Sequence, residues 1–180
     1  MNGQDPTGGP SGGDVRVGQG MIWLAALGVL AGLTWIFSLG AGPDRGGMSR
    51  GVDASGRATV TLEQGQGGHY FAEGLINGQP VAFLVDTGAT DVAISEREAR
   101  RLGLEFGPRI TVMTAAGPAP AWMTRLDRVQ VGGLSVDNVR ASITPGLGDQ
   151  ALLGMSFLRH FSLRQEDGRL VIAPPGASSS

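Results

Sequence analysis

Closely spaced turn signals are the feature that most constrains the fold of this sequence. Asn77-Gly78 is the strongest short hairpin signal, and Gly132-Gly133 and Asp167-Gly168 supply two further turns. The segments between such turns are short and alternate apolar with polar residues, as in residues 59–64 (TVTLEQ) and 69–76 (HYFAEGLI). The pattern therefore predicts a domain built mostly of short β-strands.

Other segments extend this β pattern. Residues 80–85 (PVAFLV) form a continuous apolar run, which predicts a strand covered on both faces. Residues 110–126 predict a long hairpin, and residues 128–143 predict another. A short helix is expected at residues 96–104, with Ser95 as its N-cap. The expected fold class is all-β, a small closed β-barrel or sandwich with one or two short helices.

The amino-terminal part of the sequence predicts a different organisation. Residues 1–20 are Gly-rich and favour a disordered tail, whereas residues 21–41 carry an apolar run that would span roughly 28 Å as a helix. That length predicts a single transmembrane helix, and a cleaved signal peptide is the alternative. Residues 42–57 are interpreted as a flexible linker, residues 58–174 as the folded domain and residues 175–180 as a disordered tail.

Composition excludes several classes of function. The formal net charge of -2 provides no basic surface for nucleic acid, so no nucleic-acid partner is expected. The sequence has no cysteine, which excludes disulfides and thiolate chemistry. With only His69 and His160 available, and no carboxylates at a suitable spacing, neither a metal site nor another cofactor is expected.

Asp86 is the strongest candidate for chemistry. It directly follows an apolar strand, where an unpaired carboxylate would carry a desolvation cost. Thr87 can hold the following turn through its hydroxyl, and Gly88 permits a sharp turn and a close backbone approach. The alternative is an ordinary turn at a strand end, because Asp and Gly are common turn residues.

Two motifs resemble a known family. Residues 83–90 (FLVDTGAT), followed by an apolar strand and a short helix, resemble the active-site loop of retroviral-type (retropepsin-like) aspartic proteases. Residues 152–158 (LLGMSFL) resemble the apolar strand, glycine and short helix that pack beside that loop. The hairpin around residues 110–126 lies where the family has its flap. Both motifs and the apolar amino-terminal segment are similar to those of bacterial membrane-anchored members.

The resemblance implies an aspartic endopeptidase in which two carboxylates activate a water molecule. Because the chain has one Asp-Thr-Gly, the second carboxylate is expected from Asp86 of a second subunit in a homodimer. The expected substrate is an extended peptide or protein. The implied site comprises catalytic Asp86, its supporting residues Thr87, Gly88, Ala89 and Thr90, the flap residues Thr114, Ala115, Ala116 and Gly117, and the packing residues Leu153 and Gly154.

The sequence also departs from the retroviral pattern. Retroviral enzymes often carry an ion pair between an Asp at the position of Thr90 and an Arg at the position of Met155. The loss of both groups together predicts a neutral packing alternative. Asp91 is expected to lie in the wrong place to serve as the second carboxylate. Ser156 lacks the second glycine of G-x-S-x-G and is interpreted as part of a short helix.

Location and activity have further alternatives. Positive-inside counting favours a cytoplasmic domain weakly, since Arg16 precedes residues 21–41 and Arg45 and Arg50 follow them. The resemblance instead implies anchoring in the bacterial inner membrane with a periplasmic domain, and we adopt that expectation. The alternative function is a non-catalytic dimerisation or peptide-binding module on the same fold.

Overall fold

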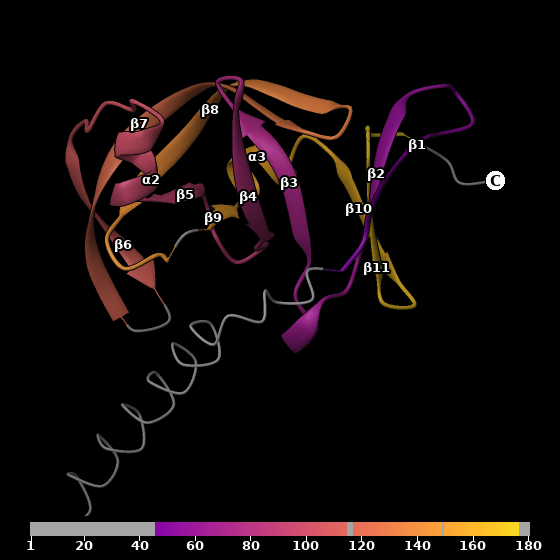
Figure 1. The fold of residues 1–180 in the computed structure, drawn as a ribbon, viewed down its shortest axis with the longest axis horizontal. Coiled ribbons are helices and arrows are strands. Elements are labelled where there is room, and N and C mark those ends of the chain that lie inside the picture. Colours follow the sequence, from indigo (N-terminus) through magenta and orange to yellow (C-terminus); the bar gives the residue numbers. More distant parts are fainter. Residues whose placement is uncertain (1–45, 115–116, 149, 177–180) are drawn as a thin grey trace, which may run out of the picture. The chain divides into compact units, whose positions relative to one another are not determined.

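The computed structural model describes residues 46–114, 117–148 and 150–176, and these are mostly β-strand (Figure 1). The helices are the 3-10 helix η1 (Gln66–Gly68), α2 (Glu96–Arg101) and α3 (Met155–Leu158). Within the described ranges, no helix is long and apolar enough to cross a membrane. The transmembrane helix predicted at residues 21–41 and the tail predicted at residues 1–20 lie outside these ranges.

Four strands form an antiparallel sheet in the order β1-β2-β11-β10. Its members are β1 (Met48–Val52), β2 (Ala58–Glu63), β10 (Ser162–Glu166) and β11 (Arg169–Ala173). The β2 and β11 strands bring fully or nearly buried side chains to the core, and these are Val60, Leu62, Leu170 and Ile172.

Strand β1 corrects the interpretation of residues 42–57 as a linker. Met48 pairs with Leu62 and Val52 with Ala58, in antiparallel register with β2. Four of the five β1 residues are exposed, so main-chain hydrogen bonds hold this strand and apolar burial contributes little. An edge strand of this kind has no apolar periodicity, which is why the sequence pattern missed it.

The second sheet has seven strands in the order β3-β4-β9-β5-β8-β7-β6. An additional pairing of β3 with β7 links the two ends of the run from β3 to β7. The strands are β3 (Phe71–Ile76), β4 (Gln79–Val85), β5 (Val92–Ser95), β6 (Arg109–Thr114), β7 (Gly117–Val131), β8 (Leu134–Thr144) and β9 (Ala151–Leu153).

The predicted hairpins are confirmed. Asn77 and Gly78 both have positive φ, 50° and 81°, as the tight turn between β3 and β4 requires. Gly132 and Gly133 join β7 to β8, and Asp167-Gly168 joins β10 to β11. The predicted helix N-cap is also confirmed, because the Ser95 hydroxyl accepts a 3.2 Å hydrogen bond from the Glu98 backbone amide.

Strand β4 differs from the expectation that both of its faces are covered. Val81 and Phe83 are buried, whereas Leu84 and Val85 are half-buried and Pro80 is exposed. One face of β4 packs into the core, and the other is only partly covered within one chain.

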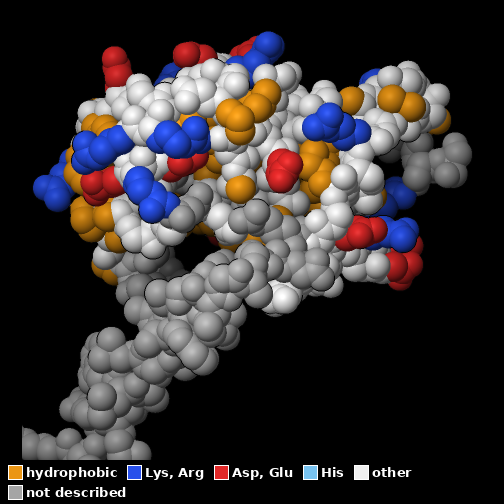
Figure 2. All heavy atoms as spheres, viewed as in Figure 1, with side chains coloured by type: hydrophobic (Ala, Val, Ile, Leu, Met, Phe, Trp, Pro, Cys, Tyr) orange, Lys and Arg blue, Asp and Glu red, His pale blue; other side chains and the backbone are white. Residues whose placement is uncertain are grey.

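On the face drawn in Figure 2, arginine and acidic side chains are interspersed and form no large field of one sign.

Candidate active site

The Asp86 loop connects β4 to β5. Asp86 directly follows Val85, and its backbone amide donates a 3.2 Å hydrogen bond to the carbonyl of Leu153 in β9. The Asp86 Oδ1 atom accepts a 2.8 Å hydrogen bond from the Gly88 amide, and the Ala89 amide donates to the Asp86 carbonyl at 3.2 Å. These contacts fix a tight turn and leave the Oδ2 atom of Asp86 without a described partner. Thr87 and Gly88 are exposed at the tip of the loop.

The predicted packing residues lie beside this loop. Strand β9 enters between β4 and β5, pairing parallel to β4 and antiparallel to β5, so that Leu153 lies beside Val85. Gly154 follows, and a Cβ atom there would lie only 2.1 Å from the Asp91 carbonyl oxygen and 2.8 Å from that of Ala89. Only glycine therefore allows the chain to pass this close to the loop.

Helix α3 begins against the same loop. The Met155 amide donates to the Ala89 carbonyl at 2.8 Å, and the Ser156 amide donates to the Thr90 carbonyl at 2.9 Å. The Ser156 hydroxyl accepts from the Val92 amide at 2.9 Å and donates to the Arg140 carbonyl at 2.7 Å. One buried serine thus ties α3 to β5 and to β8 together. Sequence reasoning treated it only as part of a short helix.

Arg140 supplies a charge contact that the sequence did not predict. Its Nε atom donates a 2.7 Å hydrogen bond to Oδ1 of Asp91. The expected neutral packing at Thr90 and Met155 stays a prediction, and the loop carries this ion pair one residue after Thr90. The partner comes from β8 and not from the residue after Gly154, a placement that only the strand register reveals.

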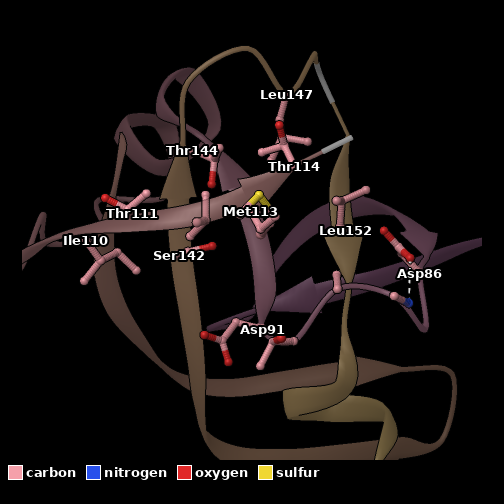
Figure 3. A pocket seen from close by; sticks show the side chains of 15 residues that line it. Asp86, Asp91, Ile110, Thr111, Met113, Thr114, Ser142, Thr144, Leu147 and Leu152 are labelled. Carbon is pink, nitrogen blue, oxygen red and sulfur yellow. Dashed lines mark hydrogen bonds between the residues drawn. The ribbon is translucent and has the colours of Figure 1, made fainter. Parts of the chain in front are cut away.

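A cavity of about 860 Å³ opens beside Asp86 (Figure 3). Its walls come from the loop at residues 86–91 with Ala93, from residues 110–114 of β6, from the end of β8 and from Leu147 and Leu152. Asp86 and Asp91 are the charged residues among the described lining. The rest of the described lining is apolar, glycine or hydroxyl-bearing, so an uncharged extended chain is compatible with most of the space.

Part of the predicted flap is described. Thr114 ends β6 and lines the cavity, and its hydroxyl donates a 2.7 Å hydrogen bond to the carbonyl of Gly117 at the start of β7. Gly117 has a φ of 108°, a conformation that favours glycine. Ala115 and Ala116, also predicted for the flap, lie outside the described residues.

Three hydroxyl-bearing residues of the cavity were not predicted as site residues, namely Thr111 on β6 and Ser142 and Thr144 on β8. Ser142 and Thr144 lie two residues apart on β8, line the cavity and are only 4% and 5% exposed. Their alternation with Ala141 and Ile143 is the one sequence signal that could have assigned them to a common face. No cluster of three or more His, Asp or Glu side chains suited to a metal ion occurs in the described part of the chain.

The comparisons with known proteins agree with this geometry. The sequence model of the family described as gag-polyprotein putative aspartyl protease matches residues 72–160, which include the Asp86 loop and α3. An uncharacterized protein of Sinorhizobium sp., from the cobV 5′ region, is 34% identical over 118 residues, or 63% of this chain and 51% of the relative. An uncharacterized protein of Rickettsia prowazekii (strain Madrid E) is 30% identical over 116 residues, or 63% of this chain and 50% of the relative.

The chain thus spans about half the length of the curated relatives it matches. Among solved structures, a retropepsin-like aspartic protease from Rickettsia conorii is 29% identical, with a TM-score of 0.55. That match covers 70% of this chain and 94% of the solved one. From these matches and from the fold, the chain belongs to the retropepsin-like aspartic protease family.

Proposed function

We propose that the chain is an aspartic endopeptidase whose active site is completed by a second copy of itself. The observation that carries the proposal is the Asp86 carboxylate, which lies in the wall of a large cavity on a loop whose tip is exposed. Family membership adds the expectation of peptide hydrolysis.

Peptide hydrolysis of this kind needs two adjacent carboxyl groups that share one proton. The ionised group takes a proton from a water molecule as the water oxygen bonds to the scissile carbonyl carbon. The protonated group donates to the carbonyl oxygen. When the C–N bond breaks, the nitrogen takes up a proton and leaves as the amine, and the new carboxylic acid is released.

A second Asp86 is the best candidate for the missing carboxyl group. Asp91 is the other described acid in the cavity, and Arg140 already engages its carboxylate at 2.7 Å. Thr87 and Gly88, exposed in one chain, are the residues through which two loops would meet.

Membrane attachment would favour this assembly. A helix at residues 21–41 would confine the copies to two dimensions and raise their effective concentration. We propose a single-pass protein of the bacterial inner membrane with a periplasmic protease domain and an extended peptide or protein as substrate.

Asp86→Asn tests the proposal. The variant is expected to fold and to form dimers as the wild type does but to lose peptide cleavage, because asparagine cannot exchange the proton. The control is Asp137→Asn. Asp137 is an exposed residue near the start of β8, it pairs with Arg128 and it does not line the cavity, so its substitution should leave cleavage unchanged. Cleavage by the wild type should be favoured at acid pH and blocked by statine-type hydroxyl isosteres.

Three outcomes would contradict the proposal. Unchanged cleavage by Asp86→Asn would remove Asp86 from the chemistry. A wild-type protein that cleaves nothing but binds extended peptides as a dimer would favour a peptide-binding module. Sedimentation of the active protein supplies the third readout, because an active strict monomer would exclude a site shared between copies.

A further inference from the structure

Two of the hydroxyls that line the cavity are close together on β8 and take no part in the proposed chemistry. Ser142 and Thr144 are 4% and 5% exposed, and both line the cavity from the same face of β8. Neither hydroxyl has a hydrogen-bond partner among the described residues. Ser95 and Ser156, the comparably buried serines, each have one through the Glu98 amide or the Val92 amide. Among the described residues, the buried side-chain polar atom without a partner is the Tyr70 hydroxyl, so the Ser142 and Thr144 hydroxyls are open to the cavity and available to a bound group.

The neighbouring residues leave space above Ser142. Leu152, Ala93 and Ser142 are cross-strand neighbours in the register of β9, β5 and β8, and all three line the cavity. Because alanine is the small member of this row, room remains between Leu152 and Ser142. Residues 110–114 of β6 also line the cavity. An extended peptide between β6 and β8 would therefore place a side chain over the hydroxyls.

The spacing of the two hydroxyls indicates which kind of substrate side chain could hydrogen-bond to both. Residues two apart on a strand lie about 7 Å apart. A carboxamide can accept a hydrogen bond of about 2.9 Å from one hydroxyl through its oxygen and donate one to the other through its nitrogen. An apolar side chain would displace water from both hydroxyls and leave them unpaired. An acidic side chain would meet Asp86 and Asp91 in the same cavity.

We propose that Ser142 and Thr144 form a polar subsite that selects substrates with an Asn or Gln side chain at one position near the scissile bond. This inference rests on the proposed function, since it assigns the substrate specificity of that site. The two residues are specificity-determining and take no part in the chemical step.

Digestion of a peptide library by the full-length protein, with cleavage products identified by mass spectrometry, tests the inference. The wild type should show enrichment of Asn or Gln at one fixed position relative to the cleaved bond. For a matched pair of peptides that differ only by Asn or Leu there, kcat/KM should favour Asn by about tenfold or more. A preference for apolar or basic side chains at every position would overturn the inference.

Substitutions then locate the preference. Ser142→Ala combined with Thr144→Val keeps the shape of the wall and removes both hydroxyls, so the Asn-to-Leu preference should be lost or inverted. The thermal midpoint should not fall, because no described hydrogen bond is removed. Ser135→Ala, at an exposed position on the same strand, should change neither quantity. A double variant that keeps the wild-type preference would overturn the inference while leaving the protease activity established.

Binding separates this inference from the proposed function. Asp86→Asn protein can be incubated with a synthetic peptide library, and the retained peptides can be sequenced. If the wild type cleaves nothing but Asp86→Asn retains Asn- or Gln-containing peptides, and the added double substitution abolishes that selection, the subsite stands without the protease. If the retained peptides show no such selection, the subsite is disproved whatever the activity of the wild type.

Discussion

The guanidinium of Arg140 on β8 lies 2.7 Å from the carboxylate of Asp91 at the end of the Asp86 loop. The Arg140 carbonyl oxygen also accepts the Ser156 hydroxyl at 2.7 Å. One residue of β8, a strand between β5 and β7, therefore holds both the loop and helix α3. Its two contacts differ in burial, and they lead to different expectations.

The Arg140–Asp91 ion pair should contribute little to stability. The Arg140 side chain is 46% exposed and that of Asp91 is 19% exposed, so solvent screens much of the attraction. A double-mutant cycle with Arg140→Gln and Asp91→Asn should give a coupling free energy of about 0.5–1 kcal/mol in urea unfolding. A coupling of several kcal/mol would mean that the pair is far less hydrated than its exposure indicates.

The Ser156 hydroxyl should matter more. Ser156→Ala removes two hydrogen bonds and leaves the Val92 amide and the Arg140 carbonyl without that partner, so unfolding free energy should fall by about 2–3 kcal/mol. Chemical denaturation followed by circular dichroism measures the loss. Ser135→Ala, exposed on β8, is the control and should change stability by about 0.5 kcal/mol or less. Equal effects of the two substitutions would contradict the role assigned to Ser156.

Gly154→Ala should disrupt the packing of α3 against the loop. The added methyl group would meet the Asp91 carbonyl oxygen at 2.1 Å, and backbone on both sides leaves little room for relief. We expect a loss of about 3 kcal/mol or more, measured by thermal or urea unfolding. Gly148→Ala is the control, because nothing lies within 4 Å of its added Cβ and its φ is not positive. Retention of wild-type stability by Gly154→Ala would mean that the loop and α3 can separate at low cost.

The turn between β1 and β2 should weaken in acid. The Asp53 carboxylate accepts from the backbone amide of Arg57, from the Arg57 side chain and from the Ser55 amide, and these contacts lower the pKa of Asp53 against the opposing effect of burial. Because the folded pKa lies below the unfolded one, the ionised group stabilises the fold above the unfolded pKa of about 3.9. This contribution disappears as pH falls through the folded pKa.

The measurement is stability as a function of pH for the wild type and Asp53→Asn. The wild type should be the more stable at neutral pH, and the difference should shrink as Asp53 becomes protonated. An NMR titration of the Asp53 carboxyl group checks the direction of its pKa shift. A stability difference that stays constant down to strongly acid pH would contradict this account.

The sequence predicted the local structure well because hairpins and caps are encoded by neighbouring residues. Asn77-Gly78 and the Ser95 cap needed only the chemistry of adjacent positions. The contacts of Arg140 and Ser156 depend on which strands lie side by side. The alternation of apolar and polar residues predicts strands but does not predict their order in a sheet. Strand β1 escaped prediction for a related reason, since its exposed residues are held by the partner strand alone.

The insertion of β9 between β4 and β5 has a consequence for synthesis of the chain. The Asp86 loop is made early, but the residues that brace it, Leu153 to Ser156, are translated more than sixty positions later. Loop closure over such a separation makes this step slow relative to local hairpins. A nascent chain that has not yet passed residue 156 therefore carries Asp86 on an unbraced loop. During synthesis, Asp86 is therefore present in the chain before the residues that complete its site have been added.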